Sequence, residues 1–250
     1  MSRIRRVASA LGTSVLLMLV TFVLDGSPAR AQNQFTNVFY TNSPTGSGDV
    51  IEATFGQQTF DHVVTCRSDT SVQGDKAVTQ KGNFISIGGV GTTNFGNPGD
   101  DVVCGDWNKD GRATIGVHRG NTFFLTDDNA NPSHVVRFGN VGDTPLVGDW
   151  NGDGVDDIGV HRGHDFFLST NLGLTVQHVV FGDSADAPVI GDWNGDGTES
   201  IGIRRGNTFF LTDNNANALY IASFGNPADR PYVGDFDGDG TDGIGVLRES

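Results

Sequence analysis

Four short segments of this chain combine aspartate, asparagine and glycine in one order. They read Gly-Asp-Trp-Asn-Lys-Asp-Gly from Gly105, Gly-Asp-Trp-Asn-Gly-Asp-Gly from Gly148 and again from Gly191, and Gly-Asp-Phe-Asp-Gly-Asp-Gly from Gly234. Oxygen atoms at alternate positions of a tight, glycine-assisted turn can converge on one point, and Ca²⁺ prefers such oxygen ligands. The pattern therefore predicts calcium-binding loops, although a metal-free turn built by the same Asp and Asn side chains is an open alternative.

The second segment has the fullest set of candidate ligands. Counting its first aspartate as position one, the predicted ligands are the side chains at positions one, three, five and nine and the carbonyl oxygen at position seven: Asp149, Asn151, Asp153, Asp157 and Val155. An EF-hand would need an acid at position twelve, where this chain has Val160. The pattern therefore argues against a helix-loop-helix site.

The other three segments offer the same positions with fewer acids. Their residues at positions one, three, five and seven are Asp106, Asn108, Asp110 and Arg112; Asp192, Asn194, Asp196 and Thr198; and Asp235, Asp237, Asp239 and Thr241. Position nine holds Thr114, Ser200 or Gly243 instead of a carboxylate. Because fewer carboxylates bind calcium more weakly, we expect the segment at Asp149 to bind most tightly, the one at Asp235 next, and the other two least.

The first aspartates of these segments are 43 residues apart each time, which marks a repeat architecture. Full repeats cover residues 95–137, 138–180 and 181–223, and each contains four short apolar or β-branched runs separated by turn residues. Four strands in about 43 residues is the size of one propeller blade, so we predict an all-β propeller. Residues 55–94 form a degenerate copy, in which Ser68 and Val72 replace the aspartates and no metal is expected.

The two ends of the chain complement each other. The last repeat, 224–250, stops after its second strand, while residues 34–54 read like a third and a fourth strand. If Asn37–Asn42 pairs with Gly243–Arg248, the ends form one blade, and the propeller closes with five blades and no free edge. The alternative is an open or larger assembly in which the half-blade pairs with another chain.

Residues 1–31 have the features of a signal peptide. Three arginines precede an apolar run from Leu11 to Leu24, and Ala29-Arg30-Ala31 resembles a cleavage site. The run is too short for a confident membrane span, so we expect a secreted protein with one propeller domain at 32–250 and no membrane contact after cleavage. That remaining chain has 12 basic and 29 acidic residues, a formal net charge of −17, which argues against nucleic acid as a partner.

These features together resemble FG-GAP repeats of the VCBS type, the units that also build the propeller of integrin alpha chains. The resemblance rests on the Phe-Gly that opens each repeat, the aspartate segment, the Ile-Gly-Val type strand after it and the period, and it covers Phe95–Arg248 best. It implies one calcium ion per loop, held through positions one, three, five, seven and nine. It also implies a non-enzymatic module that binds or adheres to an extracellular protein or glycan.

Other recurring residues suggest architectural roles. Cys66 and Cys104 occupy equivalent places in adjacent copies, where an exported protein could form a disulfide, unless neighbouring blades hold them too far apart. The arginines at the end of each second strand are expected to pair with nearby aspartates, and the paired phenylalanines to pack between sheets. His161 and His164 have a metal-like spacing that the other repeats lack, so we interpret both as loop histidines.

No catalytic motif stands out in the sequence. It contains neither Gly-x-Ser-x-Gly nor His-Glu-x-x-His, and its acids fall mainly in the predicted metal loops. We therefore expect a binding module, acting as a monomer, rather than an enzyme. The alternative is a hydrolase or lyase that acts on extracellular polysaccharide in the central channel of the propeller.

Overall fold

The computed structural model describes residues 36–46, 51–54, 60–68 and 74–249. The predicted signal peptide at 1–31 lies outside these residues. In the described part the chain forms strands and turns without helices, so this part has no helix that could span a membrane. The strands are β1 Thr36–Tyr40, β2 Ile51–Thr54, β3 His62–Cys66, β4 Lys76–Lys81, β5 Phe84–Ile87, β6 Gly91–Asn94, β7 Asp101–Gly105, β8 Thr114–Arg119, β9 Thr122–Thr126, β10 Pro132–Arg137, β11 Thr144–Gly148, β12 Asp157–Arg162, β13 Asp165–Thr170, β14 Thr175–Val180, β15 Ala187–Gly191, β16 Ser200–Arg205, β17 Thr208–Thr212, β18 Ala218–Ser223, β19 Arg230–Gly234 and β20 Gly243–Glu249.

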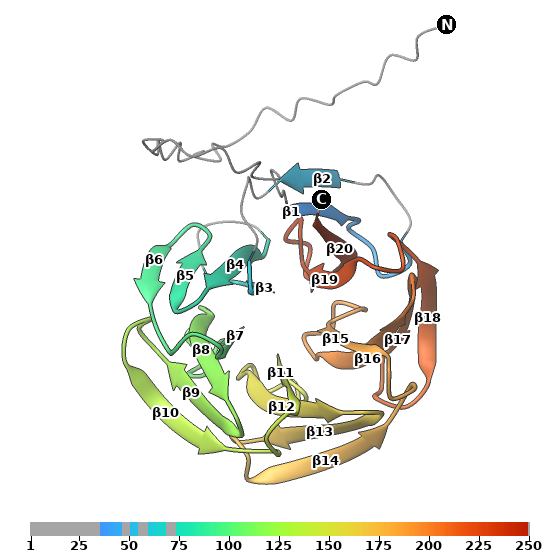
Figure 1. Ribbon diagram of the computed structural model, residues 1–250. Helices are drawn as coiled ribbons and strands as arrows, with labels where there is room; N and C mark the ends of the chain where they lie inside the picture. Colours follow the sequence, from blue (N-terminus) through green and yellow to red (C-terminus); the bar gives the residue numbers. More distant parts are fainter. Residues whose placement is uncertain (1–35, 47–50, 55–59, 69–73, 250) are drawn as a thin grey trace, which may run out of the picture. The chain divides into compact units, whose positions relative to one another are not determined.

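These strands form five antiparallel, four-stranded blades, which confirms the predicted five-bladed β-propeller (Figure 1). Four blades use consecutive strands, β3–β6, β7–β10, β11–β14 and β15–β18. The first strand of each blade is the innermost, and β3, β7, β11, β15 and β19 contact one another in a closed circle. The loops that follow these inner strands therefore meet around one end of the central channel.

The fifth blade joins the two ends of the chain, as predicted. Its strand order is β19-β20-β1-β2, and Figure 1 shows the blue strand β1 beside the dark red strand β20. In the register of β1 and β20, Phe39 lies opposite Val246. The strand β1 ends at Tyr40 rather than at Asn42, because the Thr41 hydroxyl donates to the carbonyl of Ser43 and starts a turn.

The core lies between neighbouring blades. The first phenylalanine of each predicted pair is completely buried (Phe123, Phe166 and Phe209), together with the leucine two residues later. The second strand of each full repeat is buried along nearly its whole length, because a neighbouring blade covers each face of the sheet. His161 belongs to this buried set: it lies inside β12 with 6% exposure and contacts the Phe166 ring, so its assignment to a loop was wrong.

The recurring arginines pair with aspartates, as expected. Each guanidinium donates two hydrogen bonds of 2.6–2.9 Å to one buried carboxylate, in the pairs Arg119–Asp100, Arg162–Asp143, Arg205–Asp186 and Arg248–Asp229. Each guanidinium also lies over a phenylalanine ring of its own blade. The hydrogen bonds from Arg162 hold the pKa of Asp143 below its usual value.

A disulfide joins two neighbouring inner strands. Cys66 at the end of β3 and Cys104 near the end of β7 form the bond, with their Cα atoms 6.0 Å apart. Equivalent positions on adjacent blades are this close because the inner strands converge on the channel, where the blades are narrowest. The first two complete blades are therefore covalently linked.

Candidate metal-binding site

The four predicted loops share one hydrogen-bonding pattern, seen clearly in the Asp149 loop (149–156). The Asp149 carboxylate accepts from the backbone N–H groups of Asp153, at 3.1 Å, and Gly154, at 2.6 Å. The Asn151 side-chain oxygen also accepts from Asp153 N–H, at 2.9 Å. Gly152 and Gly154 have φ of +70° and +81°, conformations that a glycine adopts without strain. These local bonds bring positions one, three and five to one side of the loop.

The Asp106 loop (106–113), the Asp192 loop (192–199) and the Asp235 loop (235–242) repeat this pattern. In each, the position-one carboxylate accepts from the N–H groups at positions five and six, at 2.7–3.1 Å. The residue at position seven donates its N–H to the position-five carboxylate at 2.8–2.9 Å, in the order Arg112, Val155, Thr198 and Thr241. The position-three residues Asn108, Asn194 and Asp237 accept from position five as Asn151 does.

The Asp235 loop has the densest group of carboxylates. Asp235, Asp237 and Asp239 each place a carboxylate oxygen within 4.8 Å of the other two, and no other three acids or histidines among the described residues converge in this way. Ligands about 2.3–2.6 Å from one Ca²⁺ ion lie at most about 5 Å from each other, so this group fits calcium. The other loops have asparagine at position three, so they offer a similar arrangement with less negative charge.

Position nine forms hydrogen bonds within its own blade. The Asp157 carboxylate accepts from the backbone N–H of Leu172 at 2.8 Å, and the residue is 1% exposed. Burial raises the pKa of Asp157. The equivalent Thr114 donates its hydroxyl to the carbonyl of Thr126, also within its own blade. Position nine therefore takes part in the hydrogen bonding of its own blade. A carboxylate can accept an N–H and still bind a cation through its other lone pairs, so the role of Asp157 as a calcium ligand stays a prediction.

Sequence reasoning missed an acid at position eight. Asp156, Glu199, Asp242 and Asp75 each accept from the position-one N–H of the preceding blade, namely from Asp106, Asp149, Asp192 and Asp235, at 2.6–3.2 Å. The N–H of each of these acids donates back to the carbonyl of the same partner. The signal was the 43-residue recurrence of an acid at Asp156, Glu199 and Asp242, which identifies a repeated role without showing that the partner is another blade.

These acids line a cavity of about 480 Å³ at the loop end of the channel. Seven carboxylates face it against one guanidinium, that of Arg67. Burial raises the pKa of Asp75 to about 6, of Asp156 to about 7 and of Glu199 to about 8. Removing carboxylates from water favours their neutral form, and the neighbouring acids add to the effect.

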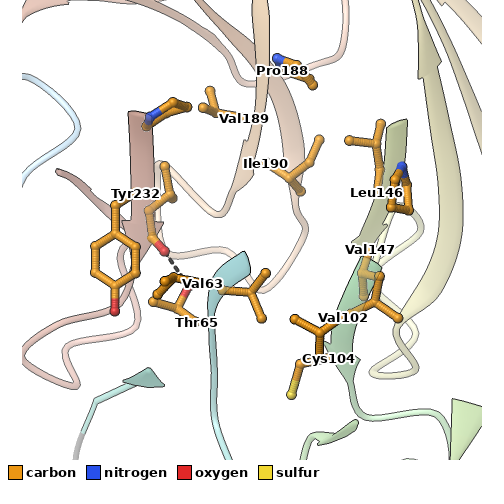
Figure 2. A pocket seen from close by; sticks show the side chains of 15 residues that line it. Val63, Thr65, Val102, Cys104, Leu146, Val147, Pro188, Val189, Ile190 and Tyr232 are labelled. Carbon is orange, nitrogen blue, oxygen red and sulfur yellow. Dashed lines mark hydrogen bonds between the residues drawn. The ribbon is translucent and has the colours of Figure 1, made fainter. Parts of the chain in front are cut away.

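A second cavity, of about 240 Å³, lies between the inner strands. Figure 2 shows side chains from all five blades around it, among them Val63, Val102, Leu146, Val189 and Tyr232. Its lining is mostly apolar, and the Thr65 hydroxyl in it donates to the carbonyl of Val233. This part of the channel therefore offers few groups for chemistry.

The degenerate copy lacks the position-one carboxylate. Ser68 stands there, and its hydroxyl donates to the carbonyl of Gly88 at 3.0 Å. Val72 lies outside the described residues. The absence of metal from this copy stays a prediction.

A scan against protein-family models found no match, and a search of curated proteins also found none. Among solved structures, the chain is similar to the crystal structure of BBS1N in complex with ARL6DN, soaked with lead, with 10% sequence identity and a TM-score of 0.42. The similarity covers 79% of this chain and 64% of that chain, so the chain spans less than two thirds of its neighbour. The strand topology of the described residues defines a five-bladed β-propeller.

Proposed function

We propose that this protein is a secreted, calcium-stabilised propeller of the FG-GAP or VCBS type that binds an extracellular protein or glycan without catalysis. The observation that carries the proposal is the repeated geometry of four Asp/Asn loops at one end of the ring, with three carboxylates converging in the Asp235 loop. Bound calcium would supply positive charge that neutralises these carboxylates and rigidifies the loops. Repeated, equivalent sites suit multivalent binding better than a single catalytic centre.

Calcium binding can be tested by melting and titration. A ligand that binds only the folded state at a hundredfold excess over its Kd stabilises that state by about 2.7 kcal/mol, so calcium should raise the Tm and chelator should lower it. Asp239→Ala should remove part of this response, whereas Asp183→Asn, outside the loops, should preserve it. A Tm that calcium and chelator leave unchanged, together with a flat calorimetric titration, would remove calcium from the proposal.

The partner requires a separate experiment. A screen of glycans and extracellular proteins, in calcium and in chelator, should yield binding that a variant with weakened loops loses. Binding that is equal in chelator would place the partner away from the loop end. Gel filtration of the same samples tests the expected monomer.

A hydrolase or lyase is the second candidate, and one observation favours it. Glu199 and Asp156 have raised pKa values and line the acidic cavity, as general acids often do. Their bonds to backbone N–H groups of the preceding blade account for both side chains without catalysis. Polysaccharide cleavage by the wild type that Glu199→Gln abolishes, with the fold intact, would favour the enzyme.

A further inference from the structure

Two cations stand at loop positions that are glycine in the other copies. Lys109 is at position four, where the other loops have Gly152, Gly195 and Gly238. Arg67 immediately precedes position one, where the three full repeats and the last repeat have Gly105, Gly148, Gly191 and Gly234. Both differences therefore introduce a long cationic side chain at the loop end of the ring.

Lys109 reaches into the loop of the next blade. Its ammonium donates to the backbone carbonyl of Asp153, the position-five residue of the Asp149 loop. The Lys109 side chain also packs beside Gly154, where an added Cβ would lie 3.0 Å from Lys109 Cε. Lys109 itself has φ of +62°, a conformation that L-residues adopt at a cost. The ammonium thus lies beside one of the predicted ligand residues.

Arg67 makes the corresponding contact with the Asp235 loop. Its Nη2 atom lies 3.2 Å from Asp235 Oδ2, the carboxylate at position one. The Asp235 side chain is 7% exposed, so this guanidinium is close to a largely buried charge. At the junction between Arg67 and the Asp106 loop, position eight is Ala113, whose N–H donates to the Arg67 carbonyl. Among the described residues, the backbone carbonyl of Arg67 therefore lies at the junction where position eight is not an acid, while its guanidinium contacts Asp235 at the neighbouring junction.

The two loops that receive these cations are those with the most acids at the predicted ligand positions one, three, five and nine. The described contacts of the Asp192 loop, in contrast, are to backbone N–H groups and to Asn194, with no lysine or arginine. A positive group beside a carboxylate cluster repels a second cation and satisfies part of the negative charge that would attract it. Counting acids alone then overstates the affinity of the Asp149 and Asp235 loops.

We propose that Lys109 and Arg67 are internal counter-cations that lower the calcium affinity of the Asp149 loop and the Asp235 loop. This inference rests on the proposed calcium function. Lys109 acts by repulsion from beside Asp153, and Arg67 by occupying an oxygen of Asp235. The Asp192 loop, which receives no such cation, takes up calcium before either of them.

The experiment is a double-mutant cycle read by calcium calorimetry and by the calcium-induced shift in Tm. Lys109→Gln removes the charge and keeps a side chain in the left-handed conformation, whereas glycine would also relieve backbone strain. We expect Lys109→Gln to lower the Kd for calcium of one site on the order of tenfold. A unit charge interacts with a divalent ion about twice as strongly as the two unit charges of an exposed ion pair interact with each other. Lys81→Gln, a lysine paired with Asp61 outside the loops, is the control for net charge.

The second arm assigns the effect to a loop. The Asp153→Ala background keeps the backbone carbonyl that Lys109 contacts but removes a predicted calcium ligand. In this background, Lys109→Gln should no longer increase the calcium affinity. Arg67→Gln should give a similar gain that Asp239→Ala removes and Asp153→Ala leaves in place. These crossed results would support the proposal.

The opposing outcomes distinguish failure of the counter-cation proposal from failure of the proposed calcium function. If the wild type takes up calcium, and the glutamine variants bind it unchanged, or gain affinity equally in every background, the counter-cation proposal is overturned while the calcium function stands. If neither the wild type nor the variants take up calcium in calorimetry, the proposed calcium function fails and the inference falls with it.

Discussion

Asp157 and Gly243 occupy the same position of their repeats and show how context decides the role of a residue. Asp157 is a predicted metal ligand, and its carboxylate also accepts from the N–H of Leu172 within its own blade. Gly243 replaces the carboxylate expected at position nine, and a Cβ at this position would lie 2.0 Å from the carbonyl oxygen of Thr41. Glycine is needed there because the N-terminal segment passes directly over it.

Gly243→Ala should therefore destabilise the closing blade. The added methyl group must displace the backbone around Thr41, and overpacking of this kind costs about 3 kcal/mol. Urea denaturation would measure the loss. Ser200→Ala, at the same position of the preceding blade, should cost no more than about 1 kcal/mol. Equal effects of the two substitutions would show that β1 does not pack on β20 in solution.

Glu199 gives stability a dependence on pH. Its folded-state pKa, raised to about 8, exceeds the unfolded value of about 4.3, so the folded state holds the proton more tightly. The associated stability is present below the unfolded pKa and is lost as the pH rises through the folded pKa. In chelator, Glu199→Gln should be more stable than the wild type at pH 9, and the two should converge near pH 4. Parallel stability curves for the two proteins would contradict the raised pKa.

The Arg–Asp pairs act in the opposite direction. Because Arg162 lowers the pKa of Asp143, this pair stabilises the fold above the unfolded pKa of about 3.9, and the contribution is lost as the pH falls through the folded pKa. Arg162→Ala should cost about 2 kcal/mol at pH 7 by leaving a buried carboxylate without its partner, and less below pH 4. Arg230→Ala breaks an exposed pair with Glu249 and should cost under about 1 kcal/mol. Denaturation series at both pH values would test this contrast.

At the level of elements, the sequence predicted what depends on local pattern. The 43-residue period, the turn residues and the unfinished last repeat were sufficient to place five blades and to pair β1 with β20. The gathering of positions one, three and five was also predictable, since the bonds that produce it lie within a single loop. The role of position eight was not, because its partner is the loop of another blade. Acid counts likewise missed Lys109 and Arg67, which reach their loops from neighbouring blades.

The disulfide gives a further prediction for the elements that it joins. Cys66 and Cys104 are 38 residues apart in sequence, and closing a loop of this length stabilises a fold by roughly 3–4 kcal/mol in the chain-entropy model. The double variant Cys66→Ser with Cys104→Ser should lose about this much in guanidinium denaturation while keeping its β circular dichroism. An unchanged midpoint would show that the inner strands hold these blades together equally well without the bond.

At the scale of the whole molecule, the ring is held together by similar junctions that differ in detail. Four junctions use a position-eight acid, and the fifth uses Ala113 with Arg67 nearby. The disulfide connects the two blades on either side of that fifth junction. A covalent bond thus reinforces the place where the repeated carboxylate bridge is missing.

The blade shared by the two ends also sets the order in which the protein can fold. Strand β1 has to wait until β20, roughly two hundred residues later, has been synthesised before it finds its partner. The three blades at 95–137, 138–180 and 181–223 can each form from neighbouring hairpins in the meantime, because their strand pairs are close in sequence. Contacts of such long range slow folding, so ring closure is expected to be the late step and the nascent N-terminal strand the segment exposed longest to aggregation.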